Sequence, residues 1–213
     1  MSPESRAREE ICRIGESLYR RGYTVGSAGN ISARLEDGFL ITPTDACLGF
    51  LDPAGLAKLD RDGQQVSGAR ASKTILLHRA VYGARPDAGG MVHTHSTSLV
   101  ALTMLPDVNR NDVLPPITPY FVMKVGHVPM IPYRRPGDPE VADLVVAHAA
   151  RVRAVLMERL GPLVWHDSVS AACFALEELE ETAKLWLTLR DVRPPPLTEA
   201  QIDDIRRAFN VEY

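Results

Sequence analysis

The chain has 213 residues, 45% of them hydrophobic, which is enough for one domain with a full core. Its net charge is -3 and it has no block of lysines or arginines, so it lacks the pattern of a nucleic-acid-binding protein, and a small-molecule substrate is expected. No apolar run reaches the length of a membrane span, and the first twenty residues are charged, so we expect a cytoplasmic protein without a membrane segment.

The first half of the chain alternates helices with short strands. A helix is predicted from Ser2 to about Gly22, because apolar residues recur there at helical spacing. A small-residue loop over 26–30 precedes two predicted hairpins, over 31–42 and 60–67. Ser72 is predicted to cap a helix over 73–84, which ends before a buried strand over 88–92.

The second half repeats this alternation. The predicted elements are a helix from 96 to about 104, a Pro-rich stretch over 106–119, a strand over 128–132, a helix over 140–150, strands over 154–157 and 162–165, a helix over 168–189 and a helix over 198–209. Hairpins interleaved with helices favour a largely antiparallel sheet covered by helices. We predict one domain over 1–193, followed by a Pro-rich linker and a C-terminal helix over 194–213.

The tripeptide His93-Thr94-His95 is the most informative short motif. Side chains alternate between faces in an extended strand, so both imidazoles are expected to point the same way. Neutral imidazole binds zinc, manganese, iron or nickel, but a stable site normally has three or more protein ligands. The motif therefore predicts half of a metal site.

A series of longer motifs carries a family resemblance. The motifs are Gly29-Asn30-Ile31-Ser32, Ile41-Thr42-Pro43-Thr44, Ser72 through His78, Tyr82-x-Ala84-Arg85-Pro86, and Val92-His93-Thr94-His95. In order and spacing this series resembles the class II aldolase and adducin family of sugar-phosphate aldolases and epimerases. The segments 72–73, 119–126, 136–139 and 177–183 are similar to the branch that decarboxylates 3-oxo-tetronate 4-phosphates.

The resemblance implies an α/β fold, a three-layer α/β/α sandwich, usually assembled as a homotetramer with the active site between subunits. It implies a divalent metal, zinc or manganese, that is held by three histidines including His93 and His95 and polarises a substrate carbonyl. It also implies that Tyr120 donates a proton in a neighbouring subunit's site. The residues implied to bind the substrate phosphate are Gly29, Asn30, Thr44, Ser72 and Lys73.

Four departures from the family pattern lie at or near positions that the resemblance assigns to the active site. Thr74 stands where the family has an acid, and Leu160 stands where it has the third histidine. Asp45 follows Thr44 where the family has glycine, and a carboxylate repels a phosphate. His166, beside Trp165, replaces another glycine.

These departures leave several interpretations open. Cys47, Asp45 or His166 could complete a weak metal site, or the two histidines could be hydrogen-bonded without metal. An ion pair between Lys73 and Asp45 could replace the phosphate. Cys47 is a candidate nucleophile and His166 a candidate general base.

The leading hypothesis for the function is a carbon–carbon lyase, of decarboxylase or aldolase type, that acts on a sugar-acid or sugar-phosphate-like substrate. The alternatives are a repurposed enzyme with a metal-independent reaction and a ligand-binding protein without catalytic activity.

Overall fold

The computed structural model describes residues 1–192, 194–211 and 213, and one sheet forms its centre. In this part of the chain, eight strands are hydrogen-bonded in the order β4-β3-β2-β1-β5-β8-β7-β6. Neighbouring strands are antiparallel except β6 and β7, which are parallel, so the sheet is largely antiparallel as predicted. The strands are β1 (Asn30–Leu35), β2 (Gly38–Ile41), β3 (Ala57–Asp60), β4 (Gln65–Ser67), β5 (Gly90–His93), β6 (Met130–Ile131), β7 (Ala154–Met157) and β8 (Gly161–His166).

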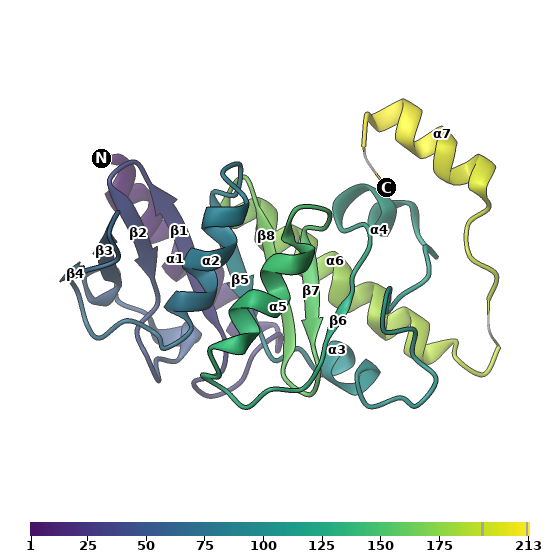
Figure 1. Ribbon diagram of the computed structural model, residues 1–213, viewed down its shortest axis with the longest axis horizontal. Coiled ribbons are helices and arrows are strands. Elements are labelled where there is room, and N and C mark those ends of the chain that lie inside the picture. Colours follow the sequence, from purple (N-terminus) through teal and green to yellow (C-terminus); the bar gives the residue numbers. More distant parts are fainter. Residues whose placement is uncertain (193, 212) are drawn as a thin grey trace.

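Helices cover both faces of the sheet and give the fold three layers, which confirms the predicted α/β/α sandwich (Figure 1). Residues of α1, α3 and α6 form one core with the sheet, and residues of α2 and α5 form the other. The helices are α1 (Pro3–Arg20), α2 (Ile75–Ala84), α3 (Thr97–Leu102), α4 (Pro119–Lys124), α5 (Glu140–Ala149), α6 (Val169–Thr188) and α7 (Glu199–Phe209), with short 3-10 turns η1 (Leu48–Phe50) and η2 (Pro53–Gly55). Among the described residues, no helix is long and apolar enough to cross a bilayer.

Alternate residues of the central strands contribute to the two cores. Val92 of β5 and Val164 of β8 belong to the core beneath α1 and α6, whereas Met91 and Trp165 belong to the core beneath α2 and α5. His93 lies two residues after Met91, so the strand alternation directs it toward the α2 and α5 layer. This alternation places the first histidine of the motif at the end of a buried strand.

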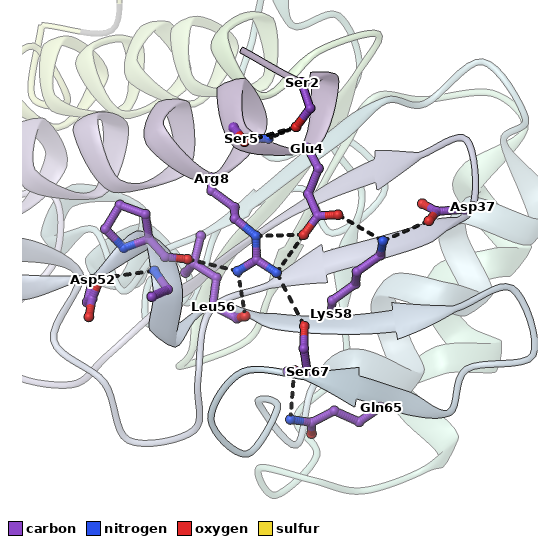
Figure 2. Close-up of polar contacts among 12 residues, drawn as sticks. Ser2, Glu4, Ser5, Arg8, Asp37, Asp52, Leu56, Lys58, Gln65 and Ser67 are labelled. Atoms are coloured by element: carbon purple, nitrogen blue, oxygen red, sulfur yellow. Dashed lines mark hydrogen bonds and ion pairs between the residues drawn. The ribbon is translucent and has the colours of Figure 1, made fainter.

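The N-terminal part of α1 is fastened to the edge of the sheet by a charged network (Figure 2). The Arg8 guanidinium donates to the Glu4 carboxylate at 2.8 Å and to the backbone carbonyls of Pro53 and Leu56 at 2.8 and 2.9 Å. The Lys58 ammonium of β3 donates to the other Glu4 oxygen at 2.8 Å. The network therefore joins α1 to the β3 and β4 hairpin by hydrogen bonds to charged groups, which are stronger than neutral ones.

Helix α4 lies in a segment for which the sequence pattern predicts no helix. Its start is nevertheless typical, because the Thr118 hydroxyl accepts a hydrogen bond from the Phe121 amide at 3.1 Å and Pro119 occupies the first turn. The helix has only six residues, which is too short for a helical period to be seen in the sequence.

Other boundaries shift by a few residues. The predicted strand over 128–132 shortens to β6, and the second hairpin begins earlier, with β3 starting at Ala57. The predicted helix over 73–84 begins only at Ile75, whose amide donates to the Ser72 carbonyl at 3.1 Å. Thr74 occupies the N-cap position, so Ser72 lies two residues earlier in the loop, where its Oγ accepts a hydrogen bond from the Thr74 amide at 3.4 Å.

Candidate active site

A cavity of about 580 Å³ lies at the end of β5, between the sheet and the layer of α2 and α5. It is lined by eight of the predicted site residues, namely Gly29, Asn30, Thr44, Asp45, Ser72, Lys73, His93 and His95. Gly29 and Asn30 lie in the loop before β1 and at the start of β1, Thr44 and Asp45 in the turn after β2, Ser72 and Lys73 in the loop before α2, and the histidines at the end of β5 and just after it. The fold thus brings the predicted phosphate residues and the predicted metal residues into one site.

His93 and His95, the histidine pair, both face this cavity, as the strand alternation predicts. Their ring centroids lie 5.0 Å apart, while Thr94 between them is fully buried. The His93 Nδ1 donates to the Pro162 carbonyl at 2.7 Å, which leaves its Nε2 free for a ligand. Burial, reinforced by the neighbouring His95, lowers the pKa of His93 to about 4, and burial also lowers the pKa of His95. Both rings are therefore neutral at neutral pH.

The donor set around the histidine pair does not fit a resident divalent metal. The backbone at Gly161 lies against the pair, because a Cβ there would be 2.2 Å from the Thr94 carbonyl oxygen and 3.2 Å from the His95 Cα. Leu160, just before Gly161, lines the cavity and offers no ligand atom. In the described part of the chain, no three His, Cys, Asp or Glu side chains are grouped to hold a metal. A stable site needs three such ligands, so these residues do not match the zinc or manganese that the resemblance implies.

Two other polar groups near the pair are already hydrogen-bonded within the protein. The Thr74 hydroxyl is hydrogen-bonded to the Ser72 hydroxyl at 2.9 Å and cannot replace the carboxylate that the family has at this position. His78 is fully buried, with its Nε2 2.6 Å from the Asn30 Oδ1 and its Nδ1 2.7 Å from the Ser32 Oγ. Both ring nitrogens of His78 are occupied, so it cannot serve as the missing ligand either.

The residues predicted to bind phosphate form a concave group that we call the anion cradle, made of Gly29, Asn30, Thr44, Ser72 and Lys73. Gly29 has a φ of +85°, and a Cβ there would be 2.7 Å from the His93 carbonyl oxygen, so this close approach requires glycine. The N-terminal end of α2 also faces the cavity, through Thr74 and Leu76. A helix N-terminus presents unpaired N–H groups to an anion.

Asp45 lines the cavity with a φ of 56°, the left-handed conformation that aspartate tolerates better than most residues. Its carboxylate forms no ion pair with Lys73 within 4.0 Å among the described contacts. The predicted replacement of the phosphate by a Lys73–Asp45 pair is therefore wrong, and the Lys73 ammonium stays available to a ligand.

Sequence reasoning missed two cationic residues of the loop before α5. Arg134 and Arg135 line the cavity, and the Arg134 guanidinium donates to Glu140 at 3.0 Å. The signal in the sequence is a pair of arginines in a Pro- and Gly-rich loop that directly follows a buried strand. Most of the remaining wall is apolar and includes Leu76, Leu77, Ile131, Val141, Ala142, Met157, Leu160 and Leu163, and the carboxylates of Asp138 and Glu158 belong to residues that also line the cavity.

The structure does not bring His166 to this site. In the register of β5 and β8, His93 pairs with Leu163 whereas His166 pairs with Gly90. Three strand residues span roughly 10 Å, so His166 lies toward the other end of the strand. It lines a second cavity of about 260 Å³, where the Arg153 guanidinium donates to its Nε2 at 2.6 Å. The hypotheses of His166 as a metal ligand or base in this pocket are therefore wrong.

Cys47 and Tyr120 do not line the cavity either. Cys47 precedes η1, and its carbonyl accepts a hydrogen bond from the Phe50 amide at 3.1 Å, so it is part of a turn and is not placed as a nucleophile or ligand in this site. Tyr120 lies on α4 with 60% of its surface exposed. A role for Tyr120 in this chain's own cavity is excluded by its position.

Comparison with known proteins agrees with this architecture. The family model of the class II aldolase and adducin N-terminal domain matches residues 9–187. Over the full length of both chains, the sequence is 62% identical to a 3-oxo-tetronate 4-phosphate decarboxylase from Cupriavidus necator. It is 45% identical to the enzyme of the same name from Escherichia coli K12, over 95% of this chain and 96% of that one. The crystal structure of YgbL from Escherichia coli superposes with a TM-score of 0.92 at 44% identity, covering 96% of this chain and 100% of YgbL. The predicted lyase class is confirmed by these relatives.

Proposed function

Because this chain belongs to the class II aldolase and adducin family, we propose that it is a carbon–carbon lyase of the decarboxylase type whose substrate is a 3-oxo sugar acid carrying a phosphate. The observation that carries the proposal is that the anion cradle and the histidine pair line one cavity. The cradle binds the phosphate, and the histidines lie beside the carbons that react. The names of the relatives support the substrate class.

Decarboxylation suits the surviving side chains better than aldol cleavage. Aldol cleavage begins when a base removes a hydroxyl proton, and the position of the family acid is occupied by Thr74. Decarboxylation of a 3-oxo acid needs no such base. The C1–C2 bond breaks, carbon dioxide leaves with C1, the electron pair passes to an enolate over C2 and C3, and C2 then takes up one proton.

The site must stabilise the oxygen that becomes negative at C3. His95 can do so, because a neutral imidazole still carries one N–H that can donate to an oxyanion. His93 cannot donate in the same way, since its Nδ1–H is already given to the Pro162 carbonyl. The cations Lys73 and Arg135 raise the positive potential of the cavity and favour anionic substrate and enolate alike.

The proposal includes a reaction without a resident metal. Purified protein is expected to contain no stoichiometric zinc or manganese, to keep its decarboxylase activity in a chelator, and to show no rise in thermal midpoint when either ion is added. The matched control is the double variant Thr74→Glu with Leu160→His, which regains a carboxylate and a third imidazole and should bind one ion per chain. Stoichiometric metal in the unmodified protein would refute the metal-independent reaction.

The proposed assembly is a homotetramer in which Tyr120 reaches the cavity of a neighbouring subunit and protonates C2. The exposure of Tyr120 and its absence from the cavity of its own chain support this placement. Light scattering should give four copies per particle, and Tyr120→Phe should lower kcat more than it changes KM.

A phosphorylated sugar acid does not cross membranes unaided, which supports a cytoplasmic location.

A second candidate function is ligand binding without catalysis, which the loss of the acid and of the third histidine favours. Release of carbon dioxide from a synthetic 3-oxo-tetronate 4-phosphate discriminates between the two. Phosphate binding together with no release above the uncatalysed rate would establish the binding protein.

A further inference from the structure

Four buried side chains form a continuous hydrogen-bonded row that leads from the α2 layer to the cavity. The Tyr82 hydroxyl lies 2.9 Å from the Ser32 Oγ, which lies 2.7 Å from the His78 Nδ1, and the His78 Nε2 lies 2.6 Å from the Asn30 Oδ1. The exposed fractions are 1% for Tyr82, 0% for Ser32 and His78, and 5% for Asn30. Of the four, Asn30 and His78 line the cavity.

With the Asn30 amide oriented as in the structure, the donors and acceptors in this row run in one direction. The Asn30 Oδ1 can only accept, so the His78 Nε2 carries a proton and donates. Full burial lowers the pKa of His78 to about 3, so the ring is neutral and its Nδ1 must accept. The single Ser32 proton is then donated to His78, and Ser32 in turn accepts from the Tyr82 hydroxyl.

This arrangement of hydrogen bonds determines which way the Asn30 amide is turned. With its oxygen held by His78, the amide nitrogen Nδ2 is the free end of the side chain and makes no hydrogen bond within the described chain. Asn30 lines the cavity, so its free amide nitrogen is available to a ligand there. An amide turned the other way would present a carbonyl oxygen to an anion, and the interaction would be repulsive.

We propose that His78 is a positioning residue, which fixes the Asn30 amide through its own Nε2–Oδ1 hydrogen bond so that two N–H groups point at a phosphoryl oxygen in the anion cradle. The inference rests on the proposed function only in that the cavity takes a phosphate. It explains why a buried, neutral histidine is hydrogen-bonded on both ring nitrogens although it ligates nothing.

The test measures binding of inorganic phosphate by calorimetry to two variants of similar volume. In His78→Gln the amide nitrogen can replace the Nε2 donor, so affinity should stay within about threefold of the unmodified protein. In His78→Leu no donor remains and the Asn30 amide is free to turn, so affinity should fall by about tenfold or more. Tyr82→Phe removes a buried hydroxyl but keeps the His78–Asn30 contact, so it should lower the thermal midpoint with little change in phosphate affinity.

A spectroscopic measurement on the unmodified protein keeps the inference testable if His78→Leu does not fold. The side-chain amide protons of Asn30 should shift in the NMR spectrum when phosphate is added, and Asn30→Ser should abolish that shift. Unchanged Asn30 signals at saturating phosphate, or equal phosphate affinity in folded His78→Leu and His78→Gln, would overturn the inference. None of these measurements requires turnover, so a failed decarboxylase assay with intact phosphate binding would contradict only the proposed reaction.

Discussion

At the scale of single residues, the two charges at the anion cradle are expected to act in opposite directions. Lys73 is exposed and lines the cavity, and it forms no salt bridge among the described residues, whereas Asp45 lines the same cavity with a carboxylate side chain. Lys73→Ala should weaken phosphate binding, and Asp45→Asn should strengthen it, each by about two- to fivefold at low salt because the groups are solvated. Asparagine tolerates the left-handed backbone at this position, so the fold should be unaffected.

Phosphate titrations at two salt concentrations check this pair of substitutions, and both effects should shrink at the higher salt. Lys124→Ala is the matched control, because Lys124 is exposed on α4 and does not line the cavity. Weaker binding in Asp45→Asn would show that the carboxylate supports the ligand and does not repel it.

The sequence predicted the histidine pair and the cradle because short-range rules suffice for them. Alternation along one strand places His93 and His95 together, and a turn rich in small residues predicts an anion site. The sequence-based prediction for His166 was wrong. The position of His166 next to Trp165 does not show which end of β8 lies at the cavity, because that depends on the register of β8 with β5. The sequence could not predict the row ending at Asn30 either, since its hydrogen-bonded partners lie up to 50 positions apart.

At the scale of elements, the Arg85 side chain connects the end of α2 to the end of α5 and also pairs with the nearby Asp87. The Arg85 guanidinium donates to both oxygens of Asp87 at 2.8 and 2.6 Å, and to the carbonyls of Ala149 and Val152 at 2.9 Å each. Arg85 lowers the pKa of Asp87 to about 2. A carboxyl whose pKa is lowered by folding adds stability above its ordinary value of 3.8 and loses that contribution as the pH falls toward 2.

Asp87→Asn should therefore reduce the free energy of unfolding at pH 6 and should have a smaller effect at pH 3. The carboxylate is 64% exposed, so the difference at pH 6 should not exceed about 1 kcal/mol. Urea unfolding of both proteins at several pH values measures it. Asp62→Asn serves as control, because Asp62 is a turn residue without an ion pair among the described contacts. A destabilisation that does not change with pH would contradict the role of the ion pair.

The elements themselves were largely predictable from periodicity, with the exceptions arising from tertiary contacts. The helix α6 begins at Val169 after a Ser168 cap, as its apolar stripe predicts. The two-residue strand β6 instead exists only because Met130 and Ile131 pair with β7 in parallel. No local pattern distinguishes two paired residues from a loop.

At the scale of the whole molecule, α7 is attached to the sandwich through a small core of its own. Ile202 and Ile205 of α7 are 4% and 8% exposed and pack against Val122 of α4, apart from the two cores of the sheet. The Thr198 side chain and Gln201 close a capping box at its start. We propose the division that the sequence indicates, a domain followed by a linker and helix, although the predicted boundary residue 193 lies outside the described residues.

If α7 is such an appendage, Ile205→Ala should release it without unfolding the sheet. An isolated helix of 11 residues is marginal in water, so the amides of α7 should then exchange with deuterium much faster, while those of β5 and β8 stay protected. Asp204→Ala on the same helix is the control, because Asp204 is exposed and its loss should leave the exchange of α7 nearly unchanged. Equal acceleration in the central strands would mean that α7 belongs to the cooperative unit of the sandwich, and the proposed division would be wrong.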